Sequence, residues 1–275
     1  MPAKKIRKTF SEIPIKTVSD FIAEINRFKK GRRKVWYRGH SEQDYKLAPS
    51  IYRKPFEPDS EDVLMSQFKS RAIPYLNNIP NGKNEYWEWL FLMQHYKIPT
   101  RLLDWTESAL VALAFAVVYR DNKKRNENKQ GAHVWCLDAL KLNSKYNNLD
   151  KDVIPNITEN EYAQDICDKI YTPPTGKFEA PIAVYGPQNN PRIVGQKGVF
   201  TIFPTKEKFQ YDDFIGDIGI KLVIKTEAQV TTIANELFGL GISESMIFPE
   251  LDSISSEIKR EHVSALDLKK RTKKN

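Results

Sequence analysis

The sequence predicts an α+β protein in which helices, mainly in the first half, pack on a small mixed or antiparallel sheet. Helical spacing of apolar residues dominates the first half of the chain and short apolar runs dominate the second, an order typical of this class. Hydrophobic residues make up 40% of the 275 residues, which is enough for a substantial core. No low-complexity linker divides the halves, so we expect one domain over residues 17–265, between basic tails at 1–16 and 266–275.

The first predicted elements are a helix and a strand. Apolar residues recur at helical spacing from 18 to 28, and Thr17 or Ser19 can cap that helix. Residues 34–38 then predict a short strand that Gly39 closes. A glycine at this point permits a tight turn or the close approach of a ligand.

Three more helices are predicted in the first half. Residues 60–76 form a helix that stops or bends near Pro74. Residues 85–96 are apolar on almost every side, which predicts a buried helix. We expect the next helix to begin near Asp104 and to run to about residue 119.

The second half consists mainly of predicted strands. Residues 141–180 show weak periodicity, so we expect a surface excursion there with one short helix near 162–170. The predicted strands are 132–137, 182–185, 198–203 and 220–224, the predicted helices are 228–237 and 251–263, and a brief apolar segment covers 246–248.

The net charge of +8 lies largely in the two ends of the chain. Residues 1–8 carry four Lys or Arg and residues 269–275 carry five, with no acid in either segment. Subtracting these nine positive charges leaves −1 for the rest of the chain. The basic tails can contact nucleic acid weakly, but this distribution does not indicate a basic groove.

The composition also indicates the cellular compartment. Two cysteines make no disulfide framework, and no apolar segment follows the charged start of the chain as in a secretory signal. The longest apolar run, residues 109–119, is too short to cross a bilayer. We expect a cytoplasmic protein without membrane contact, and the oligomeric state stays open.

Two segments combine apolar flanks with polar side chains. They are Trp-Tyr-Arg-Gly-His at 36–40 and the stretch from 94 to 106. Polar groups are costly to bury without partners, so two such clusters predict one shared polar site. Arg38 is the candidate anion clamp, because a planar guanidinium matches a phosphate or carboxylate. The alternative is an arginine at a strand end that pairs with an acid.

The second segment carries three candidates whose roles stay open. His95 can act as a general acid or base, or it can cap the end of a helix. Asp104 can be a catalytic carboxylate, or it can cap the next helix together with Glu107. Arg101 lies among apolar neighbours and needs either a carboxylate, such as Asp104, or the phosphate of a ligand.

Later segments contribute weaker candidates. Arg192 and Gln196 precede the predicted strand at 198–203, in a loop that either reaches the site or simply enters a hairpin. Glu244 stands before the apolar segment at 246–248, where it can supply a catalytic carboxylate or lie on the surface.

The motifs also carry a family resemblance. The chain resembles FRG-domain proteins, named for an aromatic-Arg-Gly motif that is Tyr37-Arg38-Gly39 here. The resemblance extends through the segments 94–106, 192–200, 240–242 and 248–251. It implies that Tyr37, Gly39 and Gln94 join the binding residues, and that the protein serves as a bacterial toxin or antiphage defence effector.

Three functions remain after the motifs are weighed. The sequence lacks Cys/His sets with zinc spacing and the glycine-rich phosphate loops, so we expect chemistry without a metal or cofactor. The first reading is a nucleotide-handling enzyme, ADP-ribosyltransferase-like or NAD-cleaving, with NAD as substrate. There Arg38 would bind the pyrophosphate and Glu244 a ribose hydroxyl. The alternatives are a nuclease-type hydrolase using His95, Asp104 and Arg101, or a non-catalytic module that binds a nucleotide or nucleic acid.

Overall fold

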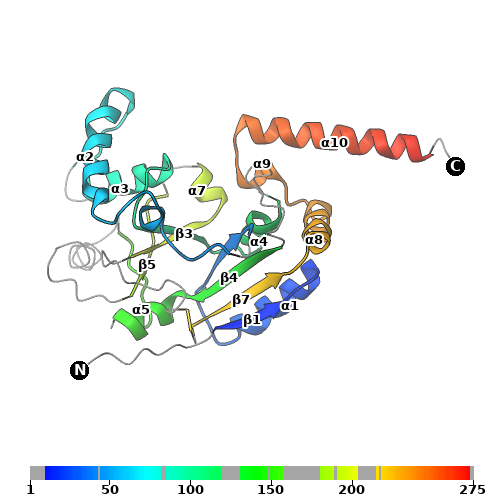
Figure 1. Ribbon diagram of the computed structural model, residues 1–275, viewed down its shortest axis with the longest axis horizontal. Coiled ribbons are helices and arrows are strands. Elements are labelled where there is room, and N and C mark those ends of the chain that lie inside the picture. The colour runs from blue at the N-terminus through cyan, green and yellow to red at the C-terminus, as the bar shows by residue number, and fades with distance from the viewer. Residues whose placement is uncertain are drawn as a thin grey trace.

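A mixed sheet forms the centre of the molecule (Figure 1). The structure is a computed structural model that describes residues 10–42, 44–81, 85–118, 131–147, 149–157, 180–188, 191–203, 215–216 and 218–272. Over this part of the chain, seven strands lie in the order β1-β7-β4-β2-β3-β6-β5. β1 is parallel to β7, and the other neighbouring strands are antiparallel. The predicted α+β fold with a mixed sheet is therefore confirmed.

The strands are short, and several match the predicted segments. They span Ser11–Pro14 (β1), Val35–His40 (β2), Leu102–Thr106 (β3), Ala132–Asp138 (β4), Ile182–Val184 (β5), Gly198–Ile202 (β6) and Gly219–Ile224 (β7).

The helices of the described residues fall mainly in the first half and at the end of the chain. They span Val18–Lys29 (α1), Ser60–Ala72 (α2), Glu85–His95 (α3), Ala109–Val117 (α4), Ala139–Asn147 (α5), Pro191–Gly195 (α7), Glu227–Gly239 (α8), Glu244–Ile247 (α9) and Leu251–Thr272 (α10). Short 3-10 turns cover Ser50–Tyr52 (η1) and Ile73–Tyr75 (η2), the second of which contains Pro74.

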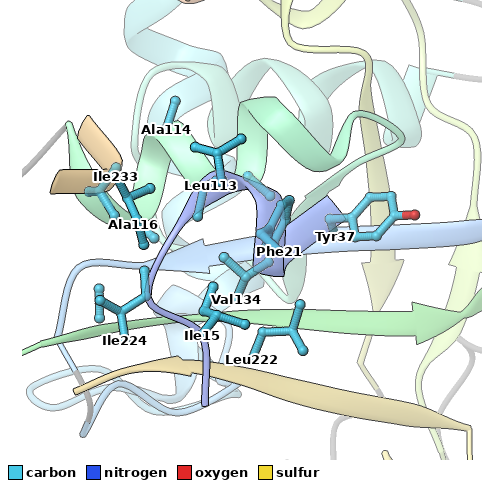
Figure 2. Close-up of a cluster of buried hydrophobic side chains, with 14 of the residues drawn as sticks. Ile15, Phe21, Tyr37, Leu113, Ala114, Ala116, Val134, Leu222, Ile224 and Ile233 are labelled. Atoms are coloured by element: carbon cyan, nitrogen blue, oxygen red, sulfur yellow. The ribbon is translucent and has the colours of Figure 1, made fainter. Parts of the chain in front are cut away.

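Two groups of helices cover the same face of the sheet. Over β2, β4 and β7, the helices α1, α4 and α8 bury a large apolar cluster that includes Phe21, Leu113 and Ile233 (Figure 2). Over β3, β5 and β6, the helices α2 and α3 bury a second cluster around Trp89 and Phe200. Because strand side chains alternate between faces, the opposite face presents a third cluster, which α5 and the segment around η1 cover.

The two halves of this sheet join at a narrow seam between β2 and β3. A single residue pair, Tyr37 with Thr106, links the two strands in register. By comparison, β2 pairs with β4 along all of its residues from Val35 to His40. Beyond Tyr37 the strands separate, and side chains fill the space between them. This seam positions the candidate site.

Several predicted boundaries need correction. Residues 102–106 form strand β3, so the helix expected from Asp104 begins only at Ala109, and Ser108 is its cap through a bond from the Val111 amide. Gly39 lies inside β2 rather than closing it. The prediction failed at β3 because Asp104 and Glu107 have the spacing of a helix capping box, which indicated a helix start inside this strand.

The expected tails and the surface excursion also differ from the structure. β1 takes residues 11–14 from the segment expected as a basic tail, and α10 continues to residue 272, through much of the other tail. The region expected as an excursion begins inside α5, where Leu142 and Asn143 are buried. The short helix expected near 162–170 lies outside the described residues.

No helix in the described part of the chain combines the length and apolar character needed to cross a membrane.

Candidate functional site

An open cavity of about 370 Å³ lies over the seam, between the two helix groups. Its volume falls in the range of roughly 300–1,000 Å³ that small-molecule sites occupy. Side chains of β2, β3, β6, α3, α4 and α7 meet there. The lining residues are Tyr37, Arg38, Gly39, Ser50, Phe91, Gln94, His95, Lys97, Ile98, Asp104, Trp105, Thr106, Phe115, Arg192, Ile193, Gln196, Gly198 and Phe200.

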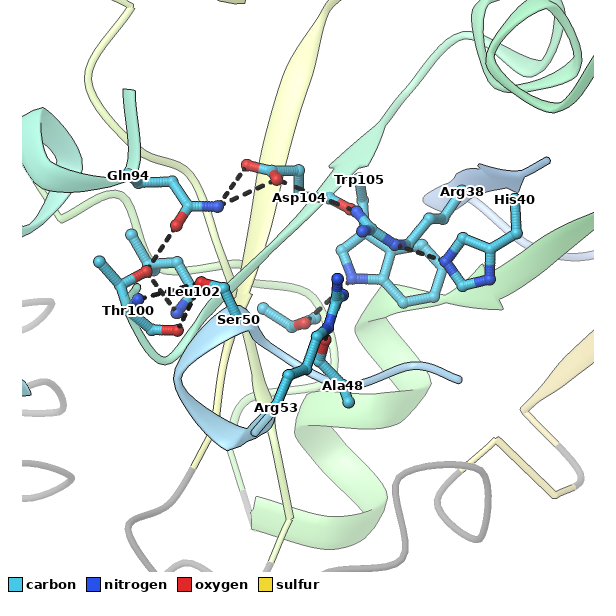
Figure 3. A network of polar contacts seen from close by, with 11 residues as sticks. Arg38, His40, Ala48, Ser50, Arg53, Gln94, Thr100, Leu102, Asp104 and Trp105 are labelled. Carbon is cyan, nitrogen blue, oxygen red and sulfur yellow. Dashed lines mark hydrogen bonds and ion pairs between the residues drawn. The ribbon is translucent and has the colours of Figure 1, made fainter. Parts of the chain in front are cut away.

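Arg38 spans the seam. In β2 it follows Tyr37, so its side chain leaves the sheet on the face opposite α4. Its Nη1 donates to the main-chain oxygen of Asp104 on β3, and lies 4.0 Å from Oδ2 of the same residue (Figure 3). Burial lowers the pKa of Arg38 to about 10, Asp104 opposes this shift, and the side chain stays charged at neutral pH. A charged guanidinium therefore stands where main-chain pairing stops.

Asp104 is held in place from α3. The Nε2 atom of Gln94 donates to both carboxylate oxygens of Asp104, at 3.0 Å each. The Oε1 atom of Gln94 accepts a bond of 2.5 Å from the hydroxyl of Thr100, whose amide donates to the hydroxyl of Ser50 (Figure 3). With its side chain 56% exposed, Asp104 is oriented yet open to a ligand.

Gly39 lets helix α4 approach the sheet. A Cβ atom at this position would overlap the main-chain oxygen of Ala112 and lie 2.8 Å from the amide nitrogen of Ala116. The glycine is therefore required by helix–sheet packing, not by a turn. Its neighbour Tyr37 is buried, and burial raises the pKa of its hydroxyl, so the phenol remains uncharged. Both residues line the cavity from below α4.

His95, Lys97 and Arg192 line the cavity from α3 and α7. The guanidinium of Arg192 stacks over the ring of Phe248 at 4.5 Å. Burial lowers the pKa of His95, Arg192 lowers it further, and Glu250 opposes the shift, so the imidazole is neutral at neutral pH. Lys97 follows α3 with a φ of 62°, a left-handed conformation that is uncommon outside glycine.

Gln196 connects this side of the cavity to the sheet. Its Nε2 donates to the main-chain oxygen of Ile247 at 3.3 Å, and its own main-chain oxygen accepts from the hydroxyl of Thr106 at 2.6 Å. Its position just before β6 agrees with the expectation that this segment reaches the site.

Two predicted site residues lie elsewhere. Arg101 is 2% exposed, and its Nε donates to Oε2 of Glu61 at 2.8 Å. Its main-chain amide donates to the other oxygen of Glu61, so this arginine ties β3 to α2. Glu244 begins α9 and does not line the cavity. The structure brings together the other eight predicted residues, Tyr37, Arg38, Gly39, Gln94, His95, Asp104, Arg192 and Gln196.

The alternative roles considered for Asp104 can now be separated. Helix α4 begins at Ala109, three residues after β3 ends at Thr106, and its capping side chain is Ser108. Asp104 is inside β3, so the capping interpretation is wrong. It is also not the carboxylate that pairs with Arg101, because Glu61 has that place.

Some lining and supporting residues were not singled out from the sequence. Phe91, Phe115 and Phe200 give the cavity an aromatic wall, but their sequence signal is that of ordinary core residues. Glu61 stands in the first turn of α2, where an acid is expected for the helix dipole alone. His40 was part of the first motif, and its bond to Arg38 could be expected from the two-residue spacing along a strand.

The charge of the cavity favours an anion. Arg38, Lys97 and Arg192 are positive, and Asp104 is the one carboxylate among the described residues that line it. A positive excess beside aromatic side chains suits a phosphorylated ligand with a ring system. In the described part of the chain, no group of three or more His, Cys, Asp or Glu side chains converges as a metal site would require.

Comparison with known families gives one match. Residues 33–126 match the model of the FRG domain, a segment that runs from the start of β2 past the end of α4. It includes Arg38, Gln94 and Asp104, but ends before the segment 192–200. No curated protein and no solved structure matches the chain.

Proposed function

Since residues 33–126 place this chain in the FRG domain family, we propose that it is a nucleotide-handling enzyme that cleaves NAD at the bond between nicotinamide and ribose. The ADP-ribosyl group would pass to water or to an acceptor. The observation that carries this proposal is the meeting of Arg38, Asp104 and Gln94 in one open, aromatic-walled cavity.

The binding part of the proposal follows from charge and shape. Arg38 is the cation nearest the seam, and it carries more N–H donors than its contacts with Asp104 and His40 use. It would bind the pyrophosphate, and Lys97 and Arg192 add positive charge at the cavity wall. The aromatic wall would hold a base or the nicotinamide ring.

Asp104 would supply the chemistry. In this mechanism the glycosidic bond breaks and its electron pair moves onto the nicotinamide nitrogen, which leaves uncharged. Positive charge then develops on the ribose, and a nearby carboxylate stabilises it. Gln94 keeps Asp104 oriented for this role by donating to its carboxylate. Asp104 thus takes the place that the sequence analysis gave to Glu244.

His95 would complete the reaction. Its lowered pKa keeps the imidazole neutral near pH 7, so it can accept the proton that the attacking water or acceptor hydroxyl loses. The FRG resemblance supports a role as a toxin or antiphage effector, in which NAD consumption would harm the cell.

A second candidate function has its own support. Both oxygens of Asp104 accept from Gln94, and Arg38 lies 4.0 Å from one of them, so the carboxylate is already engaged. An engaged carboxylate suits a module that binds a nucleotide without turnover. The nuclease-type alternative has less support, because Arg101 is buried against Glu61.

The test is nicotinamide release from NAD by the purified full chain. We expect release by the wild type and a loss of about 10²–10³-fold in Asp104→Asn, the effect of removing one electrostatic stabiliser of a transition state. Asn keeps the size of the side chain and an oxygen to accept from Gln94, so the melting temperature should hold. Arg27→Met, at a surface arginine with a 75% exposed side chain, is the matched control and should keep full activity.

Two outcomes decide between the candidates. NAD or ADP-ribose binding without nicotinamide release, unchanged in Asp104→Asn, would favour the binding module. Absence of both binding and release in the folded wild type would overturn the proposal for this cavity.

A further inference from the structure

We propose that His40, backed by His133, is a positioning residue that fixes the guanidinium of Arg38 for binding the ligand anion. The inference rests on the proposed function to the extent that Arg38 binds the ligand. It concerns a pair of buried imidazoles that the proposed chemistry does not use.

The geometry forms one continuous chain behind the cavity. The Nε atom of Arg38 donates to Nε2 of His40 at 3.0 Å (Figure 3). The other ring nitrogen of His40, Nδ1, lies 2.9 Å from Nε2 of His133 and 3.2 Å from the main-chain oxygen of Tyr45. His40 is 5% exposed and His133 is fully buried. These contacts link β2, β4 and the segment that follows β2.

The donors and acceptors of this chain can be assigned. A guanidinium can only donate, so Nε2 of His40 must accept and must carry no proton. A neutral His40 then carries its proton on Nδ1, which faces His133 and Tyr45. Since that N–H points at Nε2 of His133, this second nitrogen is an acceptor as well. His40 is thus held as the tautomer protonated on Nδ1. The same assignment leaves the proton of His133 on its Nδ1, a buried atom without a hydrogen-bond partner among the described residues.

The surroundings keep both imidazoles uncharged. Burial lowers the pKa of His40 well below its usual range, and Arg38, His133 and Arg53 lower it further, against a smaller opposite effect of the Tyr45 carbonyl. Burial likewise lowers the pKa of His133 to about 3, with contributions from Lys221 and Arg38. Protonation of His40 on Nε2 would turn its acceptor into a second donor facing Arg38.

The consequence concerns the free end of Arg38. His40 holds Nε, and the carbonyl of Asp104 holds Nη1, so the plane of the guanidinium is fixed at two points. A fixed plane leaves Nη2 oriented for an anion and removes the cost of ordering a long side chain on binding. Without His40, the same arginine would keep its charge and lose its orientation.

The experiment compares His40→Gln with His40→Leu. The Oε1 atom of Gln can reach the place of the imidazole Nε2 and accept from Arg38, whereas Leu keeps apolar bulk and accepts nothing. Titration calorimetry with ADP-ribose should give an affinity within about threefold of wild type for Gln, and at least about tenfold weaker for Leu. His262→Gln, at an exposed position on α10, is the matched control and should bind as the wild type does.

A measurement without ligand tests the same chain. In ¹⁵N spectra, the wild type should show Nε2 of His40 unprotonated and Nδ1 protonated near pH 7. The Arg38 Nε–H signal should exchange slowly in the wild type and in His40→Gln, and quickly in His40→Leu. This readout remains informative if His40→Leu folds poorly, because the wild type and the Gln variant still report on the bond.

The outcomes separate this inference from the proposed function. A wild type that neither binds ADP-ribose nor releases nicotinamide would refute the proposed function, while the spectra would still judge the bond from Arg38 to His40. A proton on Nε2 of His40 in the wild type would overturn the positioning role. Equal ADP-ribose affinity in a folded His40→Leu protein would overturn it too.

Discussion

Arg101 and Glu61 form a fully desolvated ion pair, with both side chains 3% exposed. Burial raises the pKa of Glu61, and Arg101 opposes that shift through charge and two hydrogen bonds. Each partner therefore offsets part of the cost of burying the other's charge. This pair joins β3 to α2, whereas Arg38 at the seam contacts His40 and the main chain of Asp104.

Removing one partner should be far more costly than removing both. We expect Arg101→Met to lower the free energy of unfolding by about 3–5 kcal/mol, because the Glu61 carboxylate stays buried without its counter-charge and keeps the bond from the main-chain amide of residue 101. The double variant Arg101→Met/Glu61→Leu should recover most of that loss, since apolar groups then fill the space. Urea denaturation followed by circular dichroism measures both values. A double variant as unstable as Arg101→Met would contradict this account.

Arg101 also shows how much of the structure could be predicted from the sequence. Apolar neighbours indicated that Arg101 needs a buried counter-charge, and that requirement was correct. The counter-charge is Glu61, 40 residues earlier on α2. No local sequence pattern links residues so far apart, so the partner could not be predicted. Eight predicted residues do line one cavity, because motifs at the ends of adjacent elements converge when those elements pair.

At the scale of elements, α4 and β2 approach each other closely because of Gly39. The main-chain oxygen of Ala112 occupies the place that a Cβ would take, and main-chain atoms cannot move aside as a flexible side chain can. The contact sets the height of α4 above the sheet. It thereby also sets the depth of the cavity, into which Phe115 of α4 projects.

Gly39→Ala should therefore destabilise the protein by about 1–3 kcal/mol or more through overpacking. Gly239→Ala is the matched control, because a Cβ there meets no atom within 4 Å and α8 already holds the residue in a helix. The control should be neutral or stabilising by up to about 1 kcal/mol. Thermal unfolding of both variants checks the expectation. Equal melting temperatures would show that α4 can shift without cost.

Two strands were missed from the sequence, each for its own reason. β3 carries Leu102, Leu103 and Trp105 on both faces, so its burial pattern does not alternate. β1 has only four residues and pairs at an edge of the sheet, where most of its side chains are exposed. By contrast, α1 shows both its periodicity and its capping box at Thr17, and it was predicted with the correct start. Local signals identified α1 and the fully buried strand β4, but they missed the edge strand β1 and indicated a helix start inside β3.

At the scale of the molecule, the buried imidazoles make folding sensitive to acid. Both His40 and His133 have a pKa lowered below the ordinary value of 6.5. Below pH 6.5 these two histidines therefore bind protons in the unfolded chain but remain unprotonated in the folded chain. Their contribution to stability is complete above pH 6.5 and is lost progressively as the pH falls toward the folded-state values.

Between pH 6.5 and 5, the free energy of unfolding should fall, approaching about 2.7 kcal/mol per pH unit from the two histidines together at the acid end of this window. His133→Leu should reduce this slope by about half, whereas His262→Gln on the exposed side of α10 should leave it unchanged. Chemical denaturation at a series of pH values measures the slope. A slope that His133→Leu does not alter would mean that other groups dominate the acid response.

The seam between β2 and β3 has a mechanical consequence. Within the sheet, one residue pair and one guanidinium join two panels, β1-β7-β4-β2 and β3-β6-β5. On the face opposite α4, the third apolar cluster packs across the same seam. An anion bound in the cavity would contact the same guanidinium that links β2 to β3. Ligand binding at Arg38 would therefore be coupled to the contact that this side chain makes between β2 and β3.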